Sequence, residues 1–268
     1  MDASNEPAAL RRARLVIAYD GAPFHGFAEA AGVPTVLGTL REALERVLRT
    51  PLELVGAGRT DAGVHAWGQV VSGDLPAGTD LDDLRHRVNR MCSPAVVVRA
   101  ADWADDPAFH ARFSAAWRHY RYDVLNAPVA VPALATTTWH VPRPLKLWAM
   151  QGACDPIIGE HDFTSFCRAP KVAPGATPAS MRRRVLRADW TTVHSDYGPV
   201  LRFEIRANAF CQQMVRSLVG TMVDIGQGRI GAGEMMAILH SRDRRSAGQV
   251  APPHGLSLWD VGFAAADD

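Results

Sequence analysis

The sequence predicts an α+β protein made of two tandem α+β halves, the first of them ferredoxin-like. Two observations predict this fold class. The first 109 residues contain strand and helix patterns in the order β-α-β-β-α-β, which is the order of a ferredoxin-like unit. The remainder contains a second set of strand and helix patterns of similar composition. We therefore expect two domains, residues 1–109 and residues 110–268, whose sheets pair and leave a central active-site cleft between helices.

The first half begins with a short apolar strand. Residues 14–19 are rich in β-branched side chains and end at Asp20-Gly21, which is typical of a strand followed by a turn. Over residues 37–48, leucine and valine recur at helical spacing, and Pro51 ends that helix. The other elements expected in this half are strands at residues 52–55, 69–72 and 95–99 and a helix around residues 81–88.

The second half has longer connections. Residues 120–124 alternate as in a strand, and residues 126–144 are a proline-rich connection. An apolar stripe that starts at Cys211 and includes Leu218 predicts a helix from about Phe210. The remaining elements expected here are a helix at residues 146–158 and strands at residues 185–193, 200–207 and 256–261.

The composition favours a soluble, cytoplasmic protein. No run approaches the ~18 apolar residues of a membrane span, and the first thirty residues contain no apolar stretch of signal-peptide length. The cysteines lie far apart without a CxxC spacing, so we expect packed thiols rather than a disulfide framework or a zinc site. These residues are Cys92, Cys154, Cys167 and Cys211. No two histidines lie four residues apart, as the histidines of a helical metal site do, so no metal is assigned.

Charge is distributed unevenly along the chain. Residues 1–109 carry 11 arginines and 15 acids, whereas residues 110–268 carry 18 basic residues and 13 acids. The later half is therefore the better binder of a polyanion. Its run Arg182-Arg183-Arg184 is suited to following a phosphate backbone. A solvated face explains the same run equally well.

The loop after the strand at residues 52–55 supplies the first catalytic candidate, Asp61. A carboxylate on this glycine-flanked loop can project into a cleft and stay close to backbone donors. Alternatively, Asp61 only satisfies its own turn. Arg59 two residues earlier and His65 four residues later favour the catalytic interpretation, because they place cationic or donor groups around one acid.

Polar residues of the second half are further candidates. Arg216 lies on the solvent-side flank of a predicted helix. It is either a surface charge or a partner that keeps a carboxylate ionised. Tyr120 is either a packed aromatic or a stacking plane for a nucleotide. Gln212 adds a polar group beside Arg216.

Eight short motifs follow one another between Arg14 and Phe263. They are Ala18-Tyr-Asp-Gly21, Ala57-Gly-Arg-Thr-Asp-Ala-Gly-Val-His65, Phe109-His-Ala-Arg-Phe-Ser114, Tyr120-Arg-Tyr122, His161-Asp-Phe-Thr-Ser-Phe166, Ala207-Asn-Ala-Phe210, Met214-Val-Arg-Ser-Leu-Val-Gly220 and Ala251-Pro-Pro-His-Gly-Leu256. In this order the chain resembles the tRNA pseudouridine synthases of the bacterial TruA type, which modify uridines in the anticodon stem-loop. One motif alone is weak, whereas eight in register are specific.

The resemblance implies a duplicated α+β fold with an extended antiparallel sheet flanked by helices, a homodimer, no cofactor and no metal. The implied reaction converts uridine to pseudouridine at positions 38, 39 and 40 of tRNA, by attack of an aspartate on a flipped uridine. The motifs assign the nucleophile to Asp61, the tyrosine against the target base to Tyr120, the arginine paired with the aspartate to Arg216 and the arginine of base extrusion to Arg59. Further tRNA contacts are expected from His65, Gln212, Arg182, Arg183 and Arg184.

The chemistry of this reaction agrees with the assigned roles. The N1–C1′ bond must break, the base must turn and C5 must join C1′, so the nucleotide has to leave its helix first. The sequence leaves open whether Asp61 attacks C6 of the uracil or C1′ of the ribose. Phe27-Ala28 replaces a usual Trp-Gln pair and Leu37 a common glutamine, and these departures concern tRNA selectivity rather than chemistry.

Two other functions fit parts of the sequence. A non-catalytic RNA-binding protein would explain the basic second half, but it gives Asp61 no reason to lie among arginines. A phosphoester hydrolase with an aspartate nucleophile would need a cluster of metal-binding acids, which the sequence does not contain.

Overall fold

The computed structural model describes residues 9–168 and 180–263, and the chain divides into two compact units. The first unit comprises the chain up to Ala116 together with the segment from Asp260, and the second comprises Trp117–Trp259. The last strand, β10 (Leu256–Phe263), therefore contributes residues to both units. In the first unit, the Phe263 ring packs at 5.0 Å from the ring of Phe109. The domain boundary expected between residues 109 and 110 stays a prediction.

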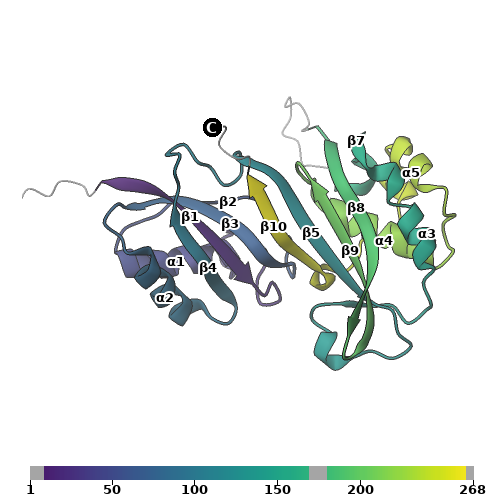
Figure 1. The fold of residues 1–268 in the computed structure, drawn as a ribbon, viewed down its shortest axis with the longest axis horizontal. Helices are drawn as coiled ribbons and strands as arrows, with labels where there is room; N and C mark the ends of the chain where they lie inside the picture. The colour runs from purple at the N-terminus through teal and green to yellow at the C-terminus, as the bar shows by residue number, and fades with distance from the viewer. Residues whose placement is uncertain (1–8, 169–179, 264–268) are drawn as a thin grey trace, which may run out of the picture. The chain divides into compact units, whose positions relative to one another are not determined.

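The first unit is a ferredoxin-like sheet covered by two helices (Figure 1). Its strands lie in the order β4-β1-β3, with the short β2 also paired to β3, and all of these pairings are antiparallel. The predicted β-α-β-β-α-β order is confirmed. The elements are β1 (Leu10–Tyr19), α1 (Val36–Leu48), β2 (Leu54–Gly56), β3 (His65–Pro76), α2 (Leu81–Cys92) and β4 (Val96–Trp103).

Alternation along β1 explains how this unit is packed. Leu15, Ile17 and Tyr19 are buried, whereas the intervening residues are only half-buried, as expected for a strand with one face on the core. Helices α1 and α2 supply the opposing apolar surface, because Leu40 and Leu44 of α1 and Leu84 and Val88 of α2 are buried.

The second unit repeats the same plan. Its strands lie in the order β10-β5-β9-β8-β7, and the short β6 runs parallel to β5. Its main elements follow one another as β5, α3, β8, β9, α4 and β10, which matches β1, α1, β2, β3, α2 and β4 of the first unit. The strand order matches as well, since β10-β5-β9-β8 corresponds to β4-β1-β3-β2. The elements are β5 (Ala115–Leu125), β6 (Trp139–His140), α3 (Leu147–Gly152), β7 (Gly159–Asp162), β8 (Arg182–Ser195), β9 (Gly198–Ala207), α4 (Met214–Gly226) and α5 (Met235–Ser241). The predicted α+β class, antiparallel and flanked by helices, is confirmed in both halves.

Short 3-10 turns connect several of these elements. They are η1 (Pro132–Leu134), η2 (Asp155–Ile157), η3 (Thr164–Phe166), η4 (Arg244–Ser246) and η5 (Pro253–Gly255). The predicted helix at residues 146–158 is too long, because α3 ends at Gly152 and Pro156 in η2 has no N–H to continue an α-helix. The connection at residues 126–144 contains η1 and β6 rather than coil alone.

Helix α4 is the central core element of the second unit, and the predicted start at Phe210 is wrong. Gln213 has a left-handed backbone (φ 64°), so the helix begins at Met214 and Cys211 lies outside it. Within α4 only Arg216 is not fully buried. A helix that is apolar on nearly all sides belongs in a core. Arg216, which was expected on a solvent-side flank, therefore lies on the least buried side of a helix that is otherwise enclosed.

Two further observations bear on the sequence predictions. The cysteines are free thiols, and Cys92, Cys154 and Cys167 are buried, as the packed-thiol interpretation predicts. Burial raises the pKa of the Cys154 thiol to about 12. None of the helices in residues 9–168 and 180–263 combines the length and the apolar character that a membrane crossing requires.

Asn89 on α2 joins that helix to the edge strand β4. Its amide nitrogen donates to the Val98 carbonyl at 2.9 Å, and its amide oxygen accepts from the Val98 N–H at 2.7 Å. We predict that Asn89→Ala lowers the free energy of unfolding by about 2 kcal/mol, because both backbone groups of a buried residue lose their partner. Urea denaturation gives this value. His86→Ala, at an exposed position of the same helix, is the control and should change it little. Equal stability of the two variants would contradict the role of Asn89.

Candidate active site

The loop that carries Asp61 runs between β2 and β3 in the first unit and is held at several points by other segments. The Phe27 N–H donates to the Thr60 carbonyl at 3.1 Å, and the Tyr19 and Thr60 hydroxyls hydrogen bond at 2.8 Å. At the start of the loop, buried Gln69 accepts from the Gly58 N–H and donates to the Gly58 carbonyl. The backbone just before Asp61 is therefore held by residues outside the loop.

A second segment, the turn at Asp20-Gly21, packs directly on this loop. A methyl group at Gly21 would lie 2.1 Å from the Val64 carbonyl oxygen, so only glycine fits there. The Gly21 N–H donates to His65 Nδ1 at 3.1 Å, and an Asp20 carboxylate oxygen lies 3.1 Å from the same nitrogen. A neutral His65 accepts the first bond, whereas a protonated one would donate to Asp20 instead. His65 thus joins the two segments, which supports a structural role.

Asp61 itself closes a tight turn, in which its carbonyl accepts from the Val64 N–H at 3.2 Å. The residue is half-buried and Arg59 is exposed. Gly63 has a positive φ of 77°, a backbone conformation that glycine adopts without steric strain, and this lets the chain complete the turn. The first unit therefore places Asp61, Arg59 and His65 on one braced loop.

Tyr120 lies on β5 of the second unit, where it is buried with 7% of its surface exposed. Its ring meets the Phe210 ring edge to face, with centroids 5.0 Å apart. Phe210 ends the Ala207–Phe210 motif just before α4. Tyr120 therefore has the packing of a core aromatic, and its ring orientation is set by Phe210.

Arg216 lies in the first turn of α4, and its side chain is hydrogen bonded to a loop 35 residues away. Its Nε donates to the Ala251 carbonyl at 2.7 Å. In return, the Ala251 N–H donates to the Arg216 carbonyl at 3.0 Å. The guanidinium is therefore oriented by the backbone of the Ala251–Leu256 motif.

The other residues expected to contact tRNA differ in their surroundings. Gln212 is exposed, and its carbonyl accepts from the Arg168 N–H at 3.0 Å. In the run on β8, Arg182 and Arg184 are exposed, whereas Arg183 between them is half-buried. Alternate residues of a strand point to opposite faces, so the three arginines do not form one basic surface.

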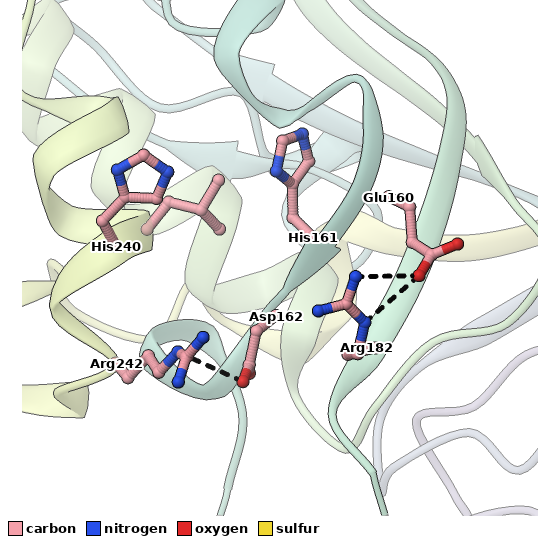
Figure 2. Close-up of a pocket in the computed structure, with 7 residues that line it drawn as sticks. Glu160, His161, Asp162, Arg182, His240 and Arg242 are labelled. Atoms are coloured by element: carbon pink, nitrogen blue, oxygen red, sulfur yellow. Dashed lines mark hydrogen bonds and ion pairs between the residues drawn. The ribbon is translucent and has the colours of Figure 1, made fainter.

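A pocket of about 280 Å³ in the second unit includes Arg182 in its lining (Figure 2). Both Nε and Nη2 of Arg182 donate to a Glu160 carboxylate oxygen, at 3.1 and 3.0 Å. Arg242 Nε lies 3.3 Å from Asp162. The Thr164 hydroxyl donates to Asp162 as well, and together with Arg242 it holds the pKa of that carboxyl below its usual range. The walls of this pocket thus pair their own charges, and we assign it no ligand.

In the part of the chain that the structure describes, no three His, Cys, Asp or Glu residues gather in a group that could hold a metal ion. The proposed pairing of Asp61 with Arg216 joins residues of different units and stays a prediction.

Sequence reasoning missed the residues that hold the candidates in place. Tyr19 and Gln69 support the Asp61 loop, and Ala251 binds Arg216. Tyr19 and Ala251 lie within motifs that carry the family resemblance, but the sequence analysis assigned neither residue a role. A buried glutamine on a strand, such as Gln69, is a signal that could have been used, because a buried amide needs partners.

Comparison with known proteins agrees with the family resemblance seen in the sequence motifs. A family model described as tRNA pseudouridine synthase matches residues 153–264. The tRNA pseudouridine synthase A of Brevibacillus brevis is 38% identical over 252 residues, covering 94% of this chain and 99% of the relative. The proteins of the same name from Corynebacterium glutamicum and Frankia casuarinae are 40% and 43% identical, and the alignments cover 96% and 95% of this chain and 90% of each relative. With similarity of this extent along nearly the whole chain, the protein belongs to the tRNA pseudouridine synthase family of isomerases.

Proposed function

We propose that the protein isomerises uridines in the anticodon stem-loop of tRNA, at positions 38, 39 and 40, with Asp61 as the nucleophile. The observation that carries this proposal is the bracing of the Asp61 loop by Phe27, Gly21 and Gln69. A nucleophile must be held in one position relative to its target, and a loop fixed by distant backbone contacts supplies such positioning.

The reaction is an exchange of glycosidic bonds. The N1–C1′ bond of uridine breaks, the uracil turns, C5 bonds to C1′, the proton of C5 passes to water and N1 takes up a proton from water. The ionised carboxylate of Asp61 forms a transient bond to the uracil C6 or to the ribose C1′ and is released at the end. A stacked base cannot undergo these steps, so the nucleotide is flipped out of its helix at a cost of a few kcal/mol.

The other candidate residues take supporting roles in this proposal. Arg216 pairs with the Asp61 carboxylate and orients it toward the uridine. Tyr120 lies against the target base. Arg59, which is exposed on the Asp61 loop, enters the position that the flipped base leaves.

Binding of tRNA is supported by chemistry outside this loop. The relatives are named as enzymes of tRNA, and the residues from 110 onward carry the excess of basic side chains. We propose that His65, Gln212, Arg182, Arg183 and Arg184 contribute contacts, and that the enzyme acts as a cytoplasmic homodimer.

Asp61→Asn should abolish isomerisation and change tRNA affinity by less than about tenfold, or ~1.4 kcal/mol. A neutral amide occupies the same space but is not a nucleophile. The measurement is release of tritium into water from tRNA that carries the label at C5 of uridine, since each isomerised uridine loses that hydrogen. Asp102→Asn, which removes an exposed acid of the same unit, should release label at the normal rate. Turnover by Asp61→Asn would remove Asp61 from its role.

Gly21→Ala should lower the single-turnover rate by about 100-fold, because its methyl group would displace the Asp61 loop by an ångström or more. The affinity for tRNA should change much less. Gly78→Ala is the matched control in the same unit, since a methyl group there meets no atom within 4 Å. If both variants react at the wild-type rate, the contact between Gly21 and Val64 does not position the nucleophile.

The choice of uridines can be read from substrate variants. A transcript in which cytidine replaces uridine at positions 38, 39 and 40 should bind normally but release no tritium. A transcript with cytidine at uridines elsewhere, and the three positions intact, serves as the control and should release label in full. Release from the first transcript would show that the enzyme acts at other positions.

A further inference from the structure

Tyr122 is buried on β5 two residues beyond Tyr120, with no exposed surface. Its hydroxyl donates to the Pro252 carbonyl at 2.8 Å. Burial raises the pKa of this tyrosine well above its usual value, although the nearby charge of Arg216 acts in the opposite direction. The hydroxyl therefore keeps its proton across the neutral range and remains a hydrogen-bond donor.

The loop that accepts this bond is packed on the same ring. A methyl group at Gly255 would lie 2.6 Å from Tyr122 Cζ and 2.9 Å from its hydroxyl oxygen. The backbone at Gly255 thus rests directly on the tyrosine. Together with the bond to Pro252, this contact fixes the loop from two sides.

The residue next to Pro252 is the one that orients Arg216. Ala251 accepts from Arg216 Nε at 2.7 Å, and its N–H donates to the Arg216 carbonyl at 3.0 Å. A shift of the Pro252 carbonyl would move the Ala251 carbonyl, since the two belong to consecutive peptide groups. The position of the guanidinium therefore depends on the Tyr122 hydroxyl.

We propose that Tyr122 is a positioning residue for catalysis, which acts through the Ala251-Pro252 backbone to hold the Arg216 guanidinium in its reactive orientation. This inference rests on the proposed role of Arg216 as partner of Asp61. Tyr122 does not contact the uridine in this proposal, which separates it from Tyr120 one strand period away.

The test is a double-mutant cycle with Tyr122→Phe and Arg216→Ala, measured as single-turnover tritium release at saturating tRNA. Tyr122→Phe keeps the ring under Gly255 and removes only the hydroxyl. Because a small displacement of a charge partner is costly, the rate should fall about tenfold in the wild-type background. In the Arg216→Ala background the same change should alter the rate less than about twofold, because the residue that Tyr122 positions is gone. Affinity for tRNA should be unchanged by Tyr122→Phe.

Ser165→Ala is the matched control. It also removes a buried hydroxyl that donates to a backbone carbonyl of the second unit, at Ile238 and 2.7 Å. A general loss of packing would therefore appear in both variants, whereas a positioning effect appears only in Tyr122→Phe.

Each possible failure has a distinct form. An equal loss of rate from Tyr122→Phe in both backgrounds, or a wild-type rate in the single variant, overturns the positioning role. If Arg216→Ala itself keeps the wild-type rate, the proposed role of Arg216 fails and the inference fails with it. Turnover by Asp61→Asn is the separate sign that the proposed nucleophile is wrong.

Discussion

Gly21 lies against the backbone of Val64 with no room for a side chain, and this contact fixes the loop on which the proposed chemistry depends. Backbone atoms and the side chains of Tyr19 and Gln69 pin the loop, so the main chain that carries Asp61 is held from outside its own turn. The strand β1 provides Tyr19 and leads into Gly21, so the first strand of the fold also determines the position of the carboxylate. The contact between Gly21 and Val64 is stiff, since it joins two backbone segments and involves no side-chain rotation.

The second unit uses the same principle for a cation. Arg216 is the one residue of α4 that is not fully buried, and its orientation comes from the carbonyl of Ala251. Asp61 and Arg216 therefore each belong to a β-α-β-β-α-β framework, and each is held by a loop beside a strand, at Gly21 after β1 and at Ala251 before β10. In the proposed reaction, a duplicated fold supplies the carboxylate and the cation from two similar frameworks.

Local periodicity was sufficient to predict most of the elements, including α1, α2 and the strands of the first unit, because their apolar spacing is set by the face they bury. It failed where a distant segment decides the backbone. Gln213 adopts its left-handed conformation beside Gln212, whose carbonyl is bound by Arg168, so the start of α4 could not be read from its own residues. Asp61, Tyr120 and Arg216 were identified from motifs. Their supports, Tyr19 for the Asp61 loop and Ala251 for Arg216, lie 41 and 35 residues from the groups they bind, which no local pattern records.

The division of β10 between the two units has a consequence for biosynthesis. The first unit is not complete until its last residues, Asp260–Phe263, have been made, although its other strands are all encoded before Ala116. The ribosome needs about 7 to 30 s to synthesise the intervening 143 residues, at ~5–20 residues per second. During that interval Phe109 lacks the ring of Phe263. The nascent chain therefore carries an unfinished apolar surface that chaperones are suited to shield.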